Sequence, residues 1–142
     1  MKLGGKYGIA PGLREIEITE SIRNAPEIDL KELIGKLRQA GFTVALDDFG
    51  TEYVNLSLLS SVEFDVLKLD KTMVDDMVNN PKAQAIIESI AGICKKMGIR
   101  VVAEGIETEE QMSVLRTCGV ETAQGYLFSR PIPVEEYEEK YL

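Results

Sequence analysis

The sequence contains no histidine and no tryptophan, and only two of its 142 residues are cysteine. Without histidine, Ser-His-Asp and Cys-His catalysis and histidine-ligated zinc sites are excluded. The cysteines, Cys94 and Cys118, do not form a Cys-x-x-Cys pair, and each lies in an apolar helical pattern, which predicts reduced, buried thiols. Acid, base and metal-binding functions are therefore left to carboxylates and lysine.

Long apolar runs are also absent from the sequence. No stretch approaches the roughly 20 residues that a membrane helix needs, and the start MKLGGKYG lacks the apolar segment of a signal peptide. We therefore expect a cytoplasmic protein with no membrane segment. The formal net charge of -8 argues against binding of a nucleic-acid polymer, because phosphate backbones are held by an excess of lysine and arginine. A small anionic ligand would need local basic residues, a helix N-terminus or divalent cations.

Short apolar runs alternate with longer segments of helical period, which predicts parallel βα units. A chain of 142 residues, 44% hydrophobic and 28% charged, is long enough for one domain and too short for two. The runs are too continuously apolar for a sheet with one wet face, as expected of parallel strands covered by helices. We expect about five strands, at residues 13–19, 43–48, 66–70, 100–104 and 122–128.

Helix signals lie between the predicted strands. Asp29, followed by Glu32 three residues later, resembles a capping box, and Gly41 lies where that helix would end. Thr108 and Gln111 form a second pair of the same kind. The other expected helices cover residues 73–78, residues 83–97 and a segment that Pro133 opens.

Polar side chains recur where the predicted strands end. In parallel sheets the βα loops converge at that edge, and the chemistry of such folds collects there. The residues concerned are Glu17, Glu20, Asp47, Asp48, Lys68, Asp70, Glu104, Glu107 and Gln124. Carboxylates inside apolar runs are costly unless they are paired or metal-bound, and carboxylate oxygens are the ligands that Mg²⁺ and Mn²⁺ prefer. The pattern favours metal-assisted phosphoryl transfer, and spacing alone leaves sugar or acyl chemistry open as alternatives.

Five sequence segments narrow this choice. EIEITES, ALDDFGTEY, VLKLDKT, RVVAEGIET and AQGYLFSRP, in this order and spacing, resemble the successive signature blocks of the EAL phosphodiesterase family. The resemblance covers residues 13 to 137. It implies an α/β fold, a TIM-like (β/α) barrel of the EAL type with flanking helices. It also implies two-metal hydrolysis of cyclic di-GMP to linear pGpG with Mg²⁺ or Mn²⁺.

The resemblance further implies roles for residues of the first three segments. Glu17, Asp47 and Asp48 would be metal ligands, with Asp47 bridging the two ions and Asp48 on the second. Lys68 would contact the attacking water, and Asp70 would support the same site. These roles come from matched positions in the family's motifs.

Residues of the last two segments, and one residue of the first, have implied roles as well. Glu104 would act near the second metal as the acid-base or water-orienting group. Glu107 and Gln124 would support the substrate and the metal ligands. Glu20 would brace the loop after Asp48, which in this family joins metal occupancy to dimerisation.

The chain departs from the family pattern in ways that affect activity. The Glu-Ala-Leu motif and the metal-binding asparagine of the next strand are absent, and both are expected upstream of Met1. We therefore expect residues 1–142 to form one partial EAL domain, an incomplete barrel with little or no activity alone. The tetrapeptide at 54–57, VNLS, spells the asparagine motif in the wrong place, which assigns Asn55 to a loop or short helix. The alternative function is a non-catalytic nucleotide-binding or protein-interaction module.

Structural alternatives remain open at several positions. Glu17 paired with Arg14, a turn formed by Asp47 and Asp48, and a helix-dipole role for Glu107 each explain one of these acids without chemistry. The tripeptide DFG at 48–50 also occurs in kinases, but no glycine-rich phosphate loop or His-Arg-Asp motif accompanies it, so a kinase is rejected.

An incomplete barrel also predicts self-association. Strands 13–19 and 122–128 would lie at the two free edges, and unpaired apolar edges invite pairing with another chain. The barrel interior, with Ile16, Ile18, Ala45 and Leu67 as candidates, would lack its opposite wall. We therefore expect a homodimer through edge pairing or strand exchange, with the family's loop-mediated dimer as the alternative geometry.

Overall fold

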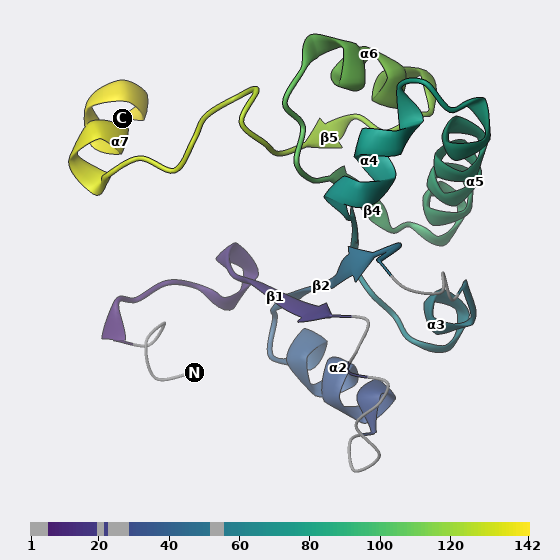
Figure 1. Ribbon diagram of the computed structural model, residues 1–142. Helices are drawn as coiled ribbons and strands as arrows, with labels where there is room; N and C mark the ends of the chain where they lie inside the picture. Colours follow the sequence, from purple (N-terminus) through teal and green to yellow (C-terminus); the bar gives the residue numbers. More distant parts are fainter. Residues whose placement is uncertain (1–5, 20–21, 23–28, 52–55) are drawn as a thin grey trace.

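The computed structural model describes residues 6–19, 22, 29–51 and 56–142. Within these residues, five parallel strands form one sheet in the order β1-β2-β3-β4-β5, so each strand pairs with the next one in sequence (Figure 1). The strands are β1 (Glu15–Thr19), β2 (Thr43–Phe49), β3 (Val66–Leu69), β4 (Arg100–Ala103) and β5 (Thr122–Ala123). The predicted α/β fold with five parallel strands is confirmed.

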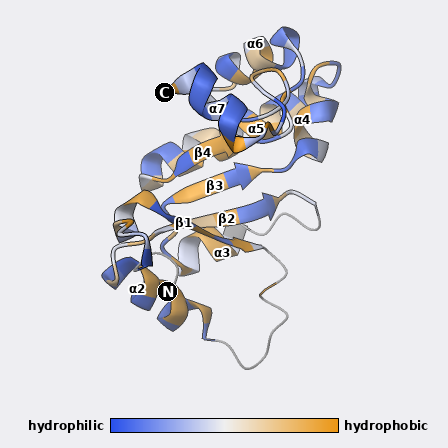
Figure 2. Ribbon diagram, turned by 90° about the vertical axis from the view of Figure 1, so that its left-hand side faces the viewer, coloured by the Kyte–Doolittle hydropathy of each residue, from blue (hydrophilic) through white to orange (hydrophobic). Residues whose placement is uncertain are grey.

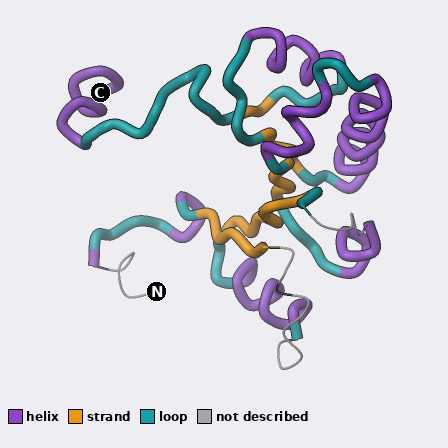
Figure 3. The backbone as a smooth tube through the Cα atoms, viewed as in Figure 1, coloured by secondary structure: helices purple, strands orange, loops and turns teal. Residues whose placement is uncertain are grey.

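Helices connect the strands. They are the 3-10 turn η1 (Pro11–Leu13) and the α-helices α2 (Leu30–Gln39), α3 (Leu56–Ser61), α4 (Lys71–Met77), α5 (Pro81–Met97), α6 (Glu109–Thr117) and α7 (Val134–Tyr141). Figure 3 shows α7 apart from the other helices, at the end of an extended connection. None of the helices in the described part of the chain is long and apolar enough to cross a membrane.

The hydrophobic core lies on one face of the sheet. Val44 and Leu46 of β2 and Leu67 and Leu69 of β3 are inaccessible to solvent and belong to one cluster with buried residues of the helices. Burying each such side chain contributes about 1.5–3 kcal/mol. Figure 2 shows the apolar colouring along β3 and β4 and polar colouring at the carboxyl ends of β2 and β3. The core therefore holds the strands in place while their carboxyl ends carry polar groups.

The sheet's other face carries the charged residues. Because side chains alternate along a strand, the residues between the core positions point away from the helices. Ile18 and Leu67 are part of the core cluster and Ile16 packs against it, so the prediction that they line the barrel interior is wrong. The interior-facing positions of β1 and β3 are instead Glu17 and Lys68, whose side chains contact each other.

A β-bulge interrupts the alternation at the carboxyl end of β2. Leu46 and Phe49 each pair with a leucine of β3, with a register shift between them, so Asp47 and Asp48 together lie opposite the single Lys68. Asp48 has a φ of 56°, in the left-handed region that non-glycine residues seldom occupy. The extra residue allows Leu46 and Phe49, three positions apart, both to be buried in the core. Both aspartates are thereby left outside the core.

Capping residues fix where the helices begin. Asp29 accepts a hydrogen bond from the backbone N–H of residue 32 at α2. Thr108 and Gln111 form the reciprocal capping box at α6. Both predicted N-caps are confirmed, but of these two pairs only Thr108 and Gln111 form the reciprocal box, and the Glu32 carboxylate contacts Lys36. The α5 helix starts two residues before its predicted boundary, because Asn80 caps it through two backbone N–H groups.

The two cysteines are buried and unpaired. Burial raises the pKa of Cys94 to about 11. Burial, as the largest effect, also raises the pKa of Cys118. Both thiols therefore stay protonated near neutral pH, and the predicted buried thiols are confirmed.

The strand predicted over residues 122–128 is much shorter in the structure. It ends at Ala123, and Phe128 N–H donates to the carbonyl of Gly125, which closes a turn. Gly125 packs directly on the backbone of Ile106, which leaves no space for a side chain. The edge-pairing prediction depended on long apolar strands at both edges of the sheet. In the structure β5 is short, and β1 exposes Glu15 and Glu17, so neither edge is of that kind.

The close approach at Gly125 gives a stability prediction. A Cβ at position 125 would lie 2.1 Å from the Ile106 carbonyl oxygen, whereas one at Gly92, in α5, would meet no atom within 4 Å. We expect Gly125→Ala to lower the free energy of unfolding by about 2–4 kcal/mol. Gly92→Ala is expected to raise it by about 0.5–1 kcal/mol, through helix propensity. Urea denaturation of the two variants checks this, and equal effects would contradict it.

Candidate functional site

A buried lysine lies on the charged face of the sheet, near the carboxyl ends of the strands. Lys68 is only 6% exposed. Its Nζ lies 2.5 Å from Glu17 Oε1, 2.6 Å from Glu104 Oε1 and 3.2 Å from Asp47 Oδ1. Glu17 comes from β1, Asp47 from β2 and Glu104 from the residue after β4. Four neighbouring strands therefore bring one charged side chain each to the same point.

The lysine in this cluster is held in its charged form. Burial alone would lower the pKa of Lys68, because it disfavours the ammonium. The contacts with Glu104, Glu17 and Asp47 outweigh burial, so the pKa lies above its ordinary value of 10.5. Lys68 is thus a fixed positive charge at physiological pH.

Asp47 is the least satisfied member of the cluster. Among the residues that the structure describes, its Oδ1 has no hydrogen-bond donor and is buried from solvent. The 3.2 Å contact with Lys68 Nζ is a charge contact without hydrogen-bond alignment. A buried carboxylate oxygen without a donor is costly, and a cation coordinated there would remove the cost.

The acids around Lys68 have the chemistry of a hard-cation site. Glu17, Asp47, Asp48 and Glu104 offer carboxylate oxygens, which suit Mg²⁺ and Mn²⁺. Residues 6–19, 29–51 and 56–142 nevertheless contain no group of three or more acids or cysteines spaced to hold an ion as they stand. The ammonium of Lys68 lies where Glu17, Asp47 and Glu104 converge. These carboxylate ligands suit a divalent cation. In the structure described, however, they are oriented toward the ammonium of Lys68.

Asp48 and Asp70 have local backbone roles. The Asp48 carbonyl accepts hydrogen bonds from the backbone N–H and the hydroxyl of Thr51, which close a turn after β2. These bonds use the backbone of Asp48 and do not involve Asp47, so they are not the turn of the aspartate pair that the sequence left open. Asp70 caps α4 by accepting from Thr72 N at 2.8 Å and from Thr72 Oγ1 at 2.6 Å. Burial raises the pKa of Asp70, but these bonds outweigh it and the pKa is lowered overall. Asp70 therefore orients the helix that follows β3.

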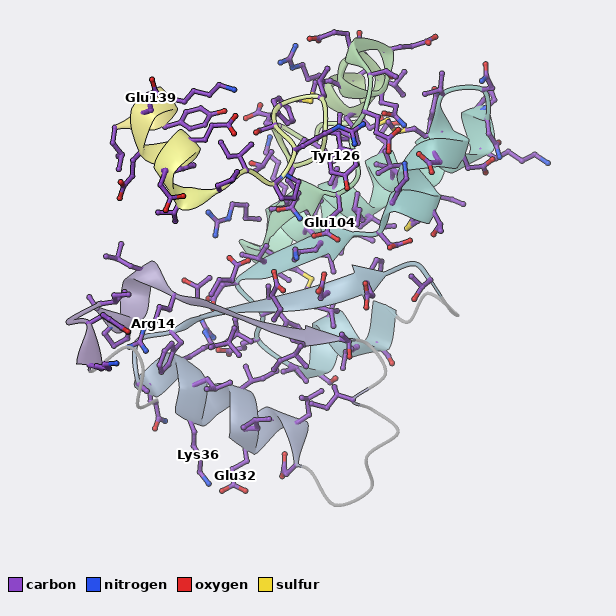
Figure 4. All side chains as sticks on the ribbon, turned by 60° about the vertical axis from the view of Figure 1, so that its left-hand side comes forward. Arg14, Glu32, Lys36, Glu104, Tyr126 and Glu139 are labelled. Atoms are coloured by element: carbon purple, nitrogen blue, oxygen red, sulfur yellow. The ribbon has the colours of Figure 1, made fainter. Side chains whose placement is uncertain are left out.

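Glu104 connects the cluster to a neighbouring pocket. Gln124 Nε2 donates to Glu104 Oε1, the oxygen that also contacts Lys68. Both residues line a pocket of about 700 Å³, together with Glu107 and Tyr126. Figure 4 shows Tyr126 and Glu104 on the same side of the sheet. Arg130, also in this lining, stacks 4.6 Å from the centre of the Tyr126 ring.

The predicted site residues thus fall into three groups. The structure brings together Glu17, Asp47, Lys68, Glu104 and Gln124. Asp48, Asp70 and Glu107 follow members of this group by one, two and three residues in the chain, and Glu107 contacts Lys71. Glu20, and the displaced Asn55, lie outside the described residues.

Two further observations refine the sequence analysis. Glu17 contacts Lys68, while Arg14 stacks 4.7 Å from the ring of Phe42, so the structural pair of Glu17 with Arg14 is not formed. Sequence reasoning gave no role in the site to Lys71, which contacts Glu107 at 3.0 Å. Its position directly after Asp70, at a strand end, was the available signal.

Comparison with known proteins identifies the family. A model of the EAL domain matches residues 2–131, and the chain belongs to the EAL domain family. The chain is 34% identical over 98% of its length to cyclic di-GMP phosphodiesterase PA2567 of Pseudomonas aeruginosa, of which it covers 24%. It is 38% identical over 93% of its length to cyclic di-GMP phosphodiesterase RocR of the same organism, of which it covers 34%.

Solved structures agree with this assignment. The chain resembles the EAL domain of Mycobacterium smegmatis DcpA with a TM-score of 0.86 and 35% identity, over 97% of this chain and 62% of that one. It resembles Klebsiella pneumoniae BlrP1, in a complex with manganese and cyclic di-GMP, with a TM-score of 0.83 and 39% identity, over 89% of this chain and 32% of that one. The chain spans between 16% and 34% of the length of the curated relatives it matches. Of the solved DcpA EAL domain, the chain covers 62%.

The lysine at the centre of the cluster gives a second prediction. We expect Lys68→Met to lower the free energy of unfolding by about 2–4 kcal/mol at pH 7, because three carboxylates lose their shared cation. The pKa of Lys68 is higher in the folded chain than its unfolded value of 10.5. Its contribution is therefore complete below that pH and is lost as the pH rises further. Chemical denaturation between pH 7 and 11.5 checks this, with exposed Lys82→Met as control. Equal loss in both variants would contradict the prediction.

Proposed function

We propose that the chain carries the metal- and phosphate-binding part of a cyclic di-GMP phosphodiesterase domain. In the complete domain, two Mg²⁺ or Mn²⁺ ions would assist hydrolysis of cyclic di-GMP to linear pGpG. The observation that carries this proposal is the meeting of Glu17, Asp47 and Glu104 at Lys68, on the carboxyl side of parallel strands. The relatives named as cyclic di-GMP phosphodiesterases support the same substrate.

The acids would hold the cations, and the bound cations would change the net charge of the site from negative to positive. Glu17, Asp47 and Asp48 are the proposed ligands, and the buried oxygen of Asp47 that lacks a donor makes it the central one. Bound divalent ions neutralise a phosphodiester and lower the pKa of a water ligand. This explains how a chain of net charge -8 takes an anionic dinucleotide.

Lys68 and Glu104 would act on the water and the reacting phosphate. Lys68 stays protonated, so it donates hydrogen bonds to an attacking water or to a phosphate oxygen and stabilises the charge that develops there. Glu104 accepts from Gln124, which fixes one carboxylate oxygen and leaves the other for a water proton. Glu107 and Gln124 line the adjoining pocket, where they would contact the substrate. Asp70 would act through its cap on α4, by keeping the end of β3 in position.

Activity of this chain by itself is expected to be slow or absent. The lysine ammonium holds the carboxylates that a cation would need, and no cluster of three acids spaced for an ion exists among the described residues. Binding of cyclic di-GMP that needs no divalent cation and is unchanged in Asp47→Asn would favour the second candidate function, a non-catalytic nucleotide-binding module. Failure to bind either metal or cyclic di-GMP would count against both.

Metal titration tests the proposed site. We expect Mn²⁺ to bind the wild-type chain weakly and to bind Asp47→Asn at least about tenfold more weakly, because the variant loses the central ligand. Asp76→Asn removes the same charge on the exposed side of α4 and is the matched control. Isothermal titration calorimetry with Mn²⁺, followed by a cyclic di-GMP turnover assay, provides the measurement. Equal affinity in wild type and Asp47→Asn would remove this site from consideration.

Self-association through α5 is a further part of the proposal. Ile86, Ile93 and Met97 are 50%, 36% and 44% exposed, and their spacing places them on one face of that helix. We expect a homodimer at high micromolar concentration by light scattering behind a sizing column. Ile93→Lys is expected to shift the mass toward the monomer, whereas Leu142→Lys, at the chain end, is not. A wild-type monomer at that concentration would contradict the prediction.

A further inference from the structure

The segment that carries Glu104 and Glu107 is held by hydrogen bonds from two sides of the sheet edge. Glu104 N–H donates to the carbonyl of Leu69 at 3.0 Å, which continues the pairing with β3. Ile106 N–H donates to the carbonyl of Gln124 at 3.1 Å, which continues the pairing with β5. The pairing of β4 with its two neighbours therefore continues as far as Ile106, past Gly105 with its positive φ of 69°, and what holds residues 107 and 108 acts on Glu104 through this short connection.

Gln111 holds the far end of this segment from α6. Its side-chain Oε1 accepts from Glu107 N at 2.8 Å and from Thr108 N at 3.0 Å. Its Nε2 donates to Asp75 Oδ1 of α4 at 3.2 Å. The capping box accounts for the bond to Thr108 alone. Of the other two bonds, the one from Glu107 N holds the segment to α6 and the one to Asp75 connects Gln111 to α4. Together they satisfy an amide that is only 8% exposed.

Lys71 holds the middle of the segment from the first turn of α4. Its Nζ lies 3.0 Å from Asp75 Oδ1 and 3.0 Å from Glu107 Oε1. Its stem packs on Gly105, where a Cβ would lie 2.5 Å from Lys71 Cγ. Lys71, Asp75 and Gln111 thus form one connected network around residues 104–108.

We propose that Gln111 is a positioning residue for the site. Through Asp75 and Lys71 it fixes residues 104–108 so that the Glu104 carboxylate meets Lys68 and the Glu107 carboxylate faces the pocket. The catalytic importance of this placement rests on the proposed function, whereas the placement itself is a property of the chain. Gln111 touches no atom of the Lys68 cluster in the described structure, so its effect on that cluster passes through the segment.

The side-chain ammonium of Lys68 is the reporter for a test, measured by ¹H–¹⁵N NMR without metal or nucleotide. Glu104→Gln defines the signal of Lys68 when the carboxylate of residue 104 is lost. We expect Gln111→Leu to move the Lys68 signal toward that reference. The amide exchange of residues 107 and 108 is expected to rise about tenfold, because both N–H groups lose their acceptor.

A matched glutamine separates positioning from general destabilisation. Gln84 is half-buried in α5 and donates to the carbonyl of Met77 at 2.9 Å, outside the network. Gln84→Leu is expected to lower stability and leave the Lys68 signal in place. An unchanged Lys68 signal in folded Gln111→Leu, or an equal shift in Gln84→Leu, would overturn the proposal.

An exchange of donor and acceptor tests the hydrogen bond itself and remains informative if Gln111→Leu does not fold. Gln111→Glu keeps the acceptor for the two N–H groups but sets a carboxylate against Asp75, so it is expected to shift the Lys68 signal. Adding Asp75→Asn restores a donor and is expected to return the signal toward wild type. Absence of both the shift and its reversal would overturn the proposal. Failure to bind Mn²⁺ would count against the proposed function alone, since none of these measurements uses it.

Discussion

The structure depends on one charge balance, that between the ammonium of Lys68 and the carboxylates of Glu17, Asp47 and Glu104. The contacts join strands that are far apart in sequence, and they occur on the face of the sheet that the helices leave uncovered. Without the lysine, three acids would be held close together by a rigid core, and their repulsion would oppose the sheet. With it, three carboxylates face one ammonium, and two negative charges remain uncompensated. The same balance that permits folding therefore leaves a site that attracts cations.

This balance is possible because each strand uses its two faces for different purposes. The helix side is filled with aliphatic residues such as Leu67 and Leu69, which are fully buried. The opposite side carries one member of the Lys68 cluster from each of the first three strands, Glu17, Asp47 and Lys68 itself, and Glu104 follows the fourth. Strong burial on one face offsets the cost of partly buried charge on the other. Cap residues at strand ends, such as Asp70, then set the direction in which each helix leaves.

The sequence predicted the parallel sheet, most helix starts and the residues that meet at Lys68, because periodicity, capping pairs and strand-end carboxylates are local signals. It did not predict which face of the strands is inside the barrel. Aliphatic residues occupy consecutive positions in β3, so its alternation is invisible in the sequence, and Leu67 was placed on the wrong side. β1 does alternate, but which of its faces meets the helices is a tertiary property, and Ile18 was placed on the wrong side as well. The length of β5 was overestimated because Gly125 reads as part of an apolar run, while its contact with the Ile106 backbone is tertiary. The contacts of Gln111 with Asp75 were equally hidden, since 36 residues separate the two.

The bulge in β2 affects the site more than the core. Leu46 and Phe49, three positions apart, both face the helices because the bulge places two residues, Asp47 and Asp48, where a regular strand would place one. Deletion of either aspartate would leave one residue between them and restore regular alternation, with both apolar side chains still on the core face. The bulge is therefore not required to bury Phe49. It doubles the number of carboxylates that β2 brings to one level of the sheet, and its removal would weaken the charge of the site while leaving the apolar pattern of the strand intact.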